Sequence, residues 1–282
     1  MRSLPTVSSG KPEDPLVGAI PVLSIDRLKM VFQARGQQVV ALDDFTLEVG
    51  SGQFVTVVGP SGCGKSTLLN AIVGLLEPTS GTIRYKGEST HGVNVEIGYV
   101  TQDDNLFPWR TLQGNVEFGM EVRGFPARDR REIAGRLIAE VGLTNFERHY
   151  RHELSGGMRQ RANIIRTLAY SPELILMDEP FGPLDAQTRL NLQNQLLQLW
   201  QVRPDTTVLF ITHDLAEAIA LADRVVVMTK RPGRIKSIYP VELPRPRDIF
   251  KVQLMSEFRV LYDGLWRILE DEMRAEGDDG QG

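Results

Sequence analysis

The chain has 282 residues, enough for one large or two modest domains, and its 41% hydrophobic and 24% charged residues are ordinary for a globular protein. Its formal net charge of -4, from 32 basic and 36 acidic residues, does not favour general nucleic-acid binding, which usually shows a basic surplus. A single cysteine, Cys63, excludes an intrachain disulfide and a cysteine zinc cluster. No apolar run approaches the roughly 18–20 residues that span a bilayer, so we expect any role at a membrane to come through a partner.

The first third of the chain alternates strands with glycine-rich turns. Residues 1–21 are rich in Pro, Ser and Gly and lack the apolar core of a signal peptide, so they are expected to form a flexible leader. Hydrophobic periodicity predicts strands at 23–28, 41–49, 53–58, 82–85 and 98–100, and a helix at 66–76. The strand at 53–58 leads directly into the glycine-rich segment before that helix.

The middle of the chain is helical, and strands return after it. Helices are predicted at 111–122, 127–141, 155–170 and 187–201, and strands at 174–177, 208–212 and 224–229. This order predicts an α/β core that carries an inserted helical subdomain at about 103–165. After a proline-rich stretch an amphipathic helix is predicted at 248–273, and the acidic, glycine-rich end is expected to be disordered.

The glycine-rich segment fits the pattern G-x-x-x-x-G-K-[ST]. Its residues are Gly59, Pro60, Ser61, Gly62, Cys63, Gly64, Lys65 and Ser66, followed by Thr67. Glycines let the backbone N–H groups turn inward as an anion nest, and the helix N-terminus adds positive potential. We expect Lys65 to reach the β- and γ-phosphates of a nucleotide, Ser66 to ligate magnesium and Thr67 to add a phosphate contact. A chance glycine-rich loop would not explain the strand before it and the helix after it.

Two acidic residues, Asp178 and Glu179, end the apolar strand at 174–177. Open α/β sheets bind ligands at the carboxyl ends of their strands. Asp178 suits magnesium, directly or through water, and Glu179 suits the polarisation of an attacking water as a general base. A solvated acid pair at a strand end is the alternative, and the phosphate loop favours the catalytic interpretation.

The run from Leu154 to Arg161 contains Ser155, Gly156 and Gly157 at the start of a predicted helix. Ser155 is an N-cap residue, and the two glycines allow close backbone approach, so this helix end can face an anion. The run resembles the signature of ATP-binding-cassette (ABC) ATPases. That resemblance implies a P-loop NTPase (RecA-like) α/β core with an antiparallel β subdomain and an inserted α-helical subdomain. It also implies a head-to-tail dimer in which each signature covers an ATP held by the other subunit.

Three further residues match motifs of that family in chain order. Gln102 resembles the Q-loop glutamine, which contacts magnesium and the γ-phosphate region and links the core to the helical subdomain. Asp185, after Leu184, resembles the D-loop aspartate at the dimer interface. His213, at the end of the strand at 208–212, resembles the switch histidine, which would contact the γ-phosphate and hold Glu179 and the water in place.

Phe32 is the candidate for the aromatic residue that stacks on adenine. Its placement in the family pattern is weaker, because residues 33–40 are expected to form a longer loop than usual. Phe32 is equally compatible with a place in the core.

The segments 104–111, 179–188 and 230–235 resemble cassettes that serve nitrate, sulfonate and taurine importers, with Pro183 standing where alanine is more usual. Trp109 lies in the first of them, beside the Q-loop. An exposed aromatic there would suit docking of a partner helix. The alternative is that Trp109 packs the helical subdomain, and both roles can hold at once.

The resemblance therefore implies an ATPase subunit that uses ATP and Mg²⁺ and energises import of a small anion. Expected partners are a second ATPase subunit, a transmembrane permease and, indirectly, a solute-binding protein, with no nucleic acid. The expected place is the cytoplasmic face of the inner or plasma membrane. The ATPase domain is expected at 22–236, and residues 237–282 are expected to form an extension with a helix and a disordered tail.

Two other classes of ABC protein are less compatible with the sequence. Soluble ABC ATPases without transport usually insert a long coiled coil or join two cassettes in one chain, and this chain does neither. Regulatory cassettes lose the catalytic glutamate or the switch histidine, and both residue types are in place here, as Glu179 and His213.

Overall fold

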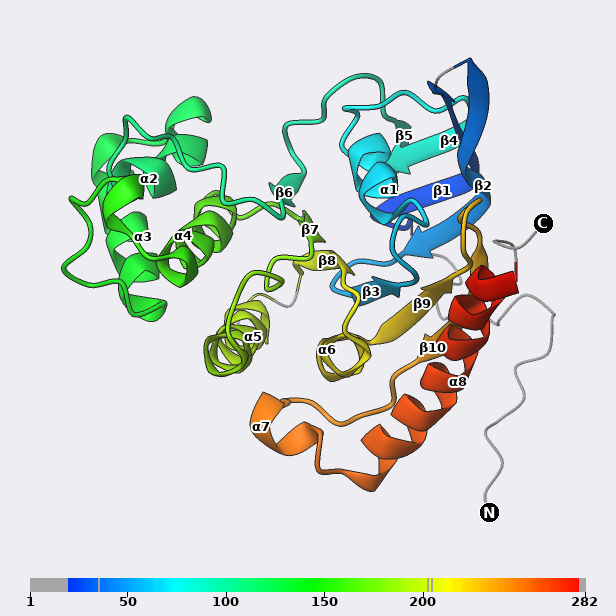
Figure 1. The fold of residues 1–282 in the computed structure, drawn as a ribbon. Coiled ribbons are helices and arrows are strands. Elements are labelled where there is room, and N and C mark those ends of the chain that lie inside the picture. Colours follow the sequence, from blue (N-terminus) through cyan, green and yellow to red (C-terminus); the bar gives the residue numbers. More distant parts are fainter. Residues whose placement is uncertain (1–19, 35, 202, 204, 279–282) are drawn as a thin grey trace.

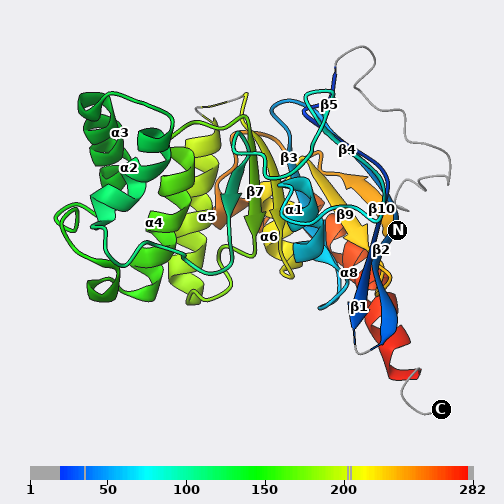
Figure 2. The same ribbon diagram turned by 90° about the horizontal axis from the view of Figure 1, so that it is seen from above.

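The computed structural model describes residues 20–34, 36–201, 203 and 205–278. Residues 1–19 of the predicted leader lie outside this part of the chain. A six-stranded sheet occupies the middle of the molecule, with a smaller antiparallel sheet on one side and a group of helices on the other (Figure 1, Figure 2).

The larger sheet has the strand order β10-β9-β3-β8-β7-β6, in which all neighbours run parallel except β10, which is antiparallel to β9. Its strands are β3 (Phe54–Val58), β6 (Gly98–Val100), β7 (Leu174–Asp178), β8 (Thr207–Ile211), β9 (Arg224–Met228) and β10 (Ile235–Pro240). Every residue of β3, β7 and β8 is buried. These strands are continuous apolar runs because layers cover both faces of a parallel sheet.

The smaller sheet has the order β2-β1-β4-β5 and is antiparallel, with strands β1 (Leu23–Ala34), β2 (Gln37–Val49), β4 (Ser80–Tyr85) and β5 (Glu88–Ser89). The long loop expected over residues 33–40 is wrong. Gln33 pairs with Gln38 and Phe32 with Val39, so this segment extends the β1–β2 hairpin. Gly36, at φ +80°, supplies the left-handed conformation that a tight turn needs.

Helices cover both faces of the larger sheet and form a separate group beyond β6. Helix α1 (Lys65–Ile72) lies between the two sheets, and α5 (Ala186–Gln201), α6 (Leu215–Leu221) and α8 (Ser256–Asp278) lie on the opposite face. The separate group contains α2 (Leu112–Val122), α3 (Ala127–Glu140), the short 3-10 helix η1 (Arg151–Glu153) and α4 (Gly156–Leu168), packed around an apolar cluster of its own. These bounds confirm the helices predicted in the middle of the sequence to within two residues.

The carboxyl-terminal prediction of one helix over 248–273 is wrong. Asp248 caps a short helix α7 (Ile249–Val252), a turn follows at 253–255, and α8 begins at Ser256. The turn lets both helices place apolar side chains on the same core, since Ile249 and Leu265 are both buried in it. Helix α8 continues to Asp278, so the expected disordered tail is helical up to that residue, and residues 279–282 lie outside the described part.

Two further predictions differ from the structure: the end of α1, and the region around residue 236. The predicted helix at 66–76 ends at Ile72, because Gly74 has φ +81° and the backbone of Gly92 lies against it, leaving no space for a side chain. Strand β10 was not predicted, and the expected domain boundary at 236 falls inside it. None of the described helices is both long enough and apolar enough to cross a membrane.

Candidate functional site

The phosphate loop connects the buried strand β3 to helix α1. Gly62 and Gly64 have φ of +72° and +103°, a region that side chains other than glycine's rarely adopt. A side chain at Gly64 would also meet Leu42 Cδ2 at 2.8 Å and the Ala41 carbonyl oxygen at 2.9 Å. The glycine conformations and the close packing against Ala41 and Leu42 therefore fix the shape of the loop that leads into α1.

Lys65 is drawn into this loop. Its Nζ donates hydrogen bonds to the carbonyl oxygens of Gly59 at 2.9 Å and Pro60 at 3.0 Å, and the residue is only 7% exposed. The ammonium group therefore lies inside the curve of the loop, held by two carbonyl oxygens that an anion would have to replace.

Eight of the site residues predicted from the sequence line one open cavity of about 360 Å³. It is lined by Ala41, Ser61, Gly62, Gly64, Lys65, Ser66, Thr67, Gln102, Glu179 and Arg231. The predicted phosphate loop, Gln102 and Glu179 come from three separate segments, so the fold brings them together. Arg231 and Ala41 were not predicted as site residues, although Arg231 lies in the segment 230–235 that resembles the importer cassettes.

Asp178 ends β7 beside the start of α1, where the nearby Ser66 hydroxyl favours its charged form. Burial raises the pKa of Asp178 above the ordinary aspartate value, so the site disfavours an uncompensated negative charge. A carboxylate and a hydroxyl are both oxygen ligands that Mg²⁺ accepts. The pair therefore fits a divalent cation, which would supply the positive charge that the buried carboxylate lacks.

Glu179 and His213 are in direct contact. His213 Nδ1 lies 2.8 Å from Glu179 Oε2, and the Glu179 N–H donates to the carbonyl oxygen of Ile211 at 3.0 Å. Glu179 has φ +42°, a strained value for a residue with a side chain. Strain of this kind is tolerated where the surroundings fix the backbone, and here it directs the carboxylate toward both the cavity and His213.

A buried carboxylate, Glu217, lines a small pocket together with Glu179 and His213, and it was not among the residues predicted from the sequence. Gln193 Nε2 donates to its Oε1 at 2.7 Å, and burial raises its pKa to about 7. The Glu217 N–H also donates to Asp214 Oδ1 at 3.1 Å as part of the α6 N-cap. The sequence signal that could have indicated Glu217 is its position three residues after Asp214, the N-cap of α6.

The signature residues lie away from this cavity. Ser155 is the exposed N-cap of α4 and accepts a hydrogen bond from the Met158 N–H at 3.3 Å. Gly156 is exposed, and a side chain at Gly157 would approach Thr188 Cγ2 at 3.4 Å. None of these three residues is among those lining the phosphate-loop cavity in the described chain.

Asp185 lies just before α5 and is also exposed. Its Oδ1 accepts a hydrogen bond from the Thr188 N–H at 3.0 Å, and contacts with Thr188 hold the pKa of this carboxyl below its usual value. Thr188 thus borders both Gly157 and Asp185. The predicted D-loop and signature therefore form neighbouring parts of one surface.

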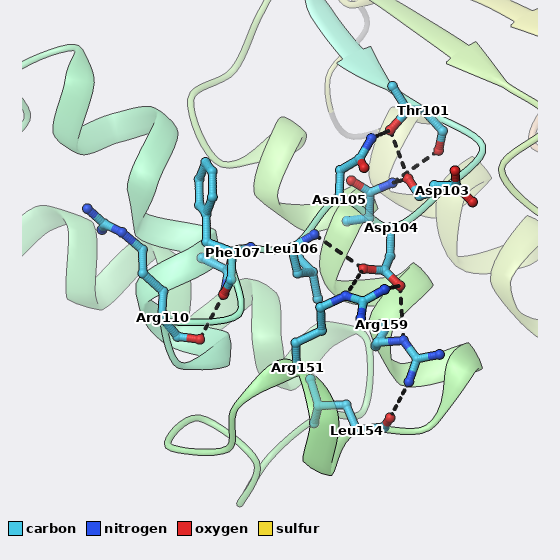
Figure 3. A network of polar contacts seen from close by, with 12 residues as sticks. Thr101, Asp103, Asp104, Asn105, Leu106, Phe107, Arg110, Arg151, Leu154 and Arg159 are labelled. Carbon is cyan, nitrogen blue, oxygen red and sulfur yellow. Dashed lines mark hydrogen bonds and ion pairs between the residues drawn. The ribbon is translucent and has the colours of Figure 1, made fainter.

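An ion-pair network joins the segment after Gln102 to the signature helix (Figure 3). The carboxylate of Asp104 accepts from Arg151 Nε at 2.7 Å and from Arg159 Nε at 2.9 Å. Arg159 also donates to the carbonyl oxygen of Leu154 at 2.7 Å, next to Ser155. The side chain of Asp104 is largely buried, so the network fixes the position of the signature relative to the segment after Gln102.

Two aromatic residues are exposed rather than buried. Phe32, on β1, is 36% exposed, which argues against a core position, but it is not among the residues that line the phosphate-loop cavity. Trp109 is 72% exposed and meets the Phe107 ring with centroids 5.3 Å apart. Trp109 therefore packs on Phe107 and still keeps most of its surface exposed, which is compatible with both alternatives.

Cys63 is 1% exposed, and burial raises the pKa of its thiol. We expect N-ethylmaleimide to label it at least about tenfold more slowly than a free cysteine, since reaction needs an accessible thiolate. Mass spectrometry of the folded protein checks the rate, and the same reaction in guanidinium is the control. Labelling of the folded chain at the unfolded rate would contradict this burial.

Comparison with known proteins gives the family. The ABC transporter family model matches residues 42–182. An uncharacterized ABC transporter ATP-binding protein of Methanocaldococcus jannaschii is 49% identical, over 89% of this chain and 92% of the relative. The nitrate import ATP-binding protein NrtD of Synechocystis sp. is 46% identical, over 84% and 90%. The taurine import ATP-binding protein TauB of Roseobacter denitrificans is 40% identical, over 91% and 98%.

Solved structures agree with this assignment. The ATP-binding cassette MJ0796, in a dimeric post-hydrolysis state bound to ADP and Pi, matches with a TM-score of 0.71 at 28% identity, over 79% of this chain and 100% of that chain. A second dimeric structure of MJ0796 gives the same TM-score at 29% identity. The chain therefore belongs to the ABC transporter family, as an ATP-binding and ATP-hydrolysing subunit with the α/β cassette fold.

Proposed function

We propose that this chain energises import of a small anion such as nitrate, a sulfonate or taurine. The relatives named as nitrate and taurine import proteins, similar over most of their length, support this transport class. The observation that carries the ATPase role is the convergence of the phosphate loop, Gln102 and Glu179 on one cavity. Purification of the chain with its permease, followed by ATP-dependent uptake of these anions into vesicles, tests the proposal.

Phosphate binding follows from the loop geometry. The backbone N–H groups of residues 59–67, apart from Pro60, which has none, and the start of α1 would hold the phosphates. Lys65 would move from its two carbonyl partners to the β- and γ-phosphates. Phe32 would stack on adenine. Ser66, Asp178 and Gln102 would hold Mg²⁺, which, when bound, neutralises charge on the β- and γ-phosphates.

Hydrolysis would depend on the Glu179–His213 pair. Glu179 would accept the proton of the attacking water as general base. His213 would keep the Glu179 carboxylate in place through their 2.8 Å contact and approach the γ-phosphate with its other ring nitrogen. The hydrogen bond between the buried side chains of Gln193 and Glu217, near His213, would help to keep the Glu179–His213 pair in place.

The second half of the site would come from another copy. Ser155, Gly156 and Gly157 would cover the γ-phosphate of the partner, and Asp185 would cross the interface beside them. Two observations support this: the signature lies outside the chain's own cavity, and the related cassette was solved as a dimer. In such a two-fold arrangement the phosphate loop of each copy meets the signature of the other, so the dimer has two equivalent sites.

The permease would dock on the exposed aromatic segment around Trp109. Phe107 is fixed beneath Trp109 by an edge contact with Phe118, with ring centroids 4.7 Å apart, and its N–H donates to Asn115 Oδ1 at 2.7 Å. A rigid exposed aromatic suits a partner helix. The chain would then sit at the cytoplasmic face of the membrane as a peripheral subunit, with a solute-binding protein on the other side.

Trp109→Ala tests this docking surface. We expect the amount of co-purified permease to fall by at least about tenfold, since a central interface tryptophan often contributes about 2 kcal/mol or more. Trp266→Ala, which removes another exposed tryptophan from α8, is the matched control and should leave the complex intact. Equal permease recovery with both variants would rule out Trp109 as an anchor.

A further inference from the structure

Arg231 lines the phosphate-loop cavity, a position that the resemblance of segment 230–235 to importer cassettes did not indicate. It lies in the connection between β9 and β10, 169 residues after Gly62 of the phosphate loop. Its Nε and Nη2 both donate to the Gly62 carbonyl oxygen, at 3.1 and 2.9 Å.

The charge of Arg231 has no acidic partner in the described part of the chain. Its hydrogen bonds go to a neutral carbonyl, whereas its neighbour Arg234 pairs with Asp43, and Lys236 pairs with Glu272 at 2.6 Å. A guanidinium has five N–H donors, and a single carbonyl cannot neutralise it. A cation placed at the edge of an anion nest without a carboxylate is suited to phosphate.

The connection that carries Arg231 is held tightly against the phosphate loop. The Gly233 N–H donates to the Ala41 carbonyl oxygen at 2.9 Å, and its own carbonyl accepts from the Asp43 N–H at 3.1 Å. A side chain at Gly233 would lie 2.1 Å from the Cys63 carbonyl oxygen, so only glycine permits this approach. The position of Arg231 is thus fixed by backbone contacts with both β2 and the phosphate loop.

Helix α8 braces the same connection from its other side. Glu272 Oε2 accepts a hydrogen bond from the Lys230 N–H at 3.0 Å, and Glu272 Oε1 accepts from Lys236 Nζ at 2.6 Å. The carboxyl-terminal half of α8 lies beside β10 and extends toward this connection (Figure 1). The carboxyl-terminal extension therefore supports a segment that borders the nucleotide site.

We propose that Arg231 is a direct ligand of the phosphates of ATP, delivered to the phosphate loop by the β9–β10 connection. The inference rests on the proposed phosphate binding by residues 59–67. Arg231 supplies a second cation opposite Lys65, and its two hydrogen bonds to Gly62 hold the guanidinium in position before the nucleotide arrives. A preorganised donor of this kind spends little conformational entropy on binding.

Isothermal titration with inorganic tripolyphosphate and with a non-hydrolysable ATP analogue tests this proposal on the full chain. We expect Arg231→Ala to weaken both ligands by about ten- to hundredfold, the range for a lost charge-assisted hydrogen bond. Arg231→Lys, which keeps the charge but not the fork, should give an intermediate loss. Arg234→Ala, on the same connection but paired with Asp43, should change both affinities by less than about twofold, as expected for an exposed ion pair.

The outcomes separate the possible failures. Unchanged tripolyphosphate affinity in Arg231→Ala would overturn the proposal, as would equal losses in Arg231→Ala and Arg234→Ala, which would indicate a general effect on the connection. Melting temperatures without ligand identify a variant that is simply less stable. If the wild-type chain bound neither ligand, the phosphate-binding function itself would fail, whatever the variants did.

Discussion

Glu179→Gln is expected to abolish turnover while leaving ATP bound. Glutamine has the size of glutamate and can keep a hydrogen bond to His213, whose Nδ1 lies 2.8 Å from the carboxylate, but it cannot take a proton from water. Loss of a general base lowers the rate by about 10²- to 10⁴-fold. Because the nucleotide would no longer be hydrolysed, the dimer it closes should persist.

Two measurements check this expectation. Phosphate release gives the rate, and light scattering with ATP gives the dimer. Glu173→Gln makes the same chemical change just before the amino-terminal end of β7, at an exposed carboxylate paired with Lys86 at 2.7 Å. It should leave both quantities unchanged, since exposed ion pairs contribute little. Turnover near the wild-type rate in Glu179→Gln would remove Glu179 from the mechanism.

Local motifs predicted the catalytic side of the site because each lies at the end of an apolar strand. The strand before Gly59 and the strand before Asp178 are recognisable by their β-branched and apolar runs, and both are buried throughout. Parallel strands place their carboxyl ends at one edge of the sheet. Sequence order and strand type were therefore enough to predict that the phosphate loop and Glu179 meet.

Contacts between distant segments could not be predicted in the same way. Arg231 meets Gly62 only because β9 pairs with β3 and Gly233 packs on the loop, and neither fact leaves a local signal. The hairpin of β1 and β2 extends through residues 33–40 because these residues pair across the strands. Such pairing depends on the neighbouring strand, so the local sequence predicted a loop there instead. The turn at 253–255 likewise depends on how two helices reach one core.

The proposed sharing of each site between two copies predicts the second large effect, in which one inactive variant restores the activity of another. Ser155→Arg places a bulky cation where the signature would cover the partner's γ-phosphate, and the isolated chain should still bind ATP because Ser155 does not line its own cavity. Lys65→Ala removes the ammonium group from the loop while leaving the signature intact. Each variant alone should fall to background ATPase activity.

A mixture of the two variants should recover activity. In a mixed dimer the phosphate loop of the Ser155→Arg chain meets the intact signature of the Lys65→Ala chain, which completes one site, while the other site carries both defects. An equal mixture should therefore approach about one quarter of wild-type activity, since about half of random two-fold dimers are mixed and each has one intact site of two.

A control separates lost capping from lost composite binding. Thr111 caps α2 as Ser155 caps α4, accepting from the Gly114 N–H at 3.2 Å, and loss of either cap costs about 1 kcal/mol of stability. Thr111→Arg should therefore lower the melting temperature as Ser155→Arg does but keep ATPase activity. Background activity in the mixture, together with no mixed dimers between differently tagged chains, would contradict a site shared between two copies. Recovery would require that Ser155 of one chain acts on the nucleotide held by Lys65 of the other.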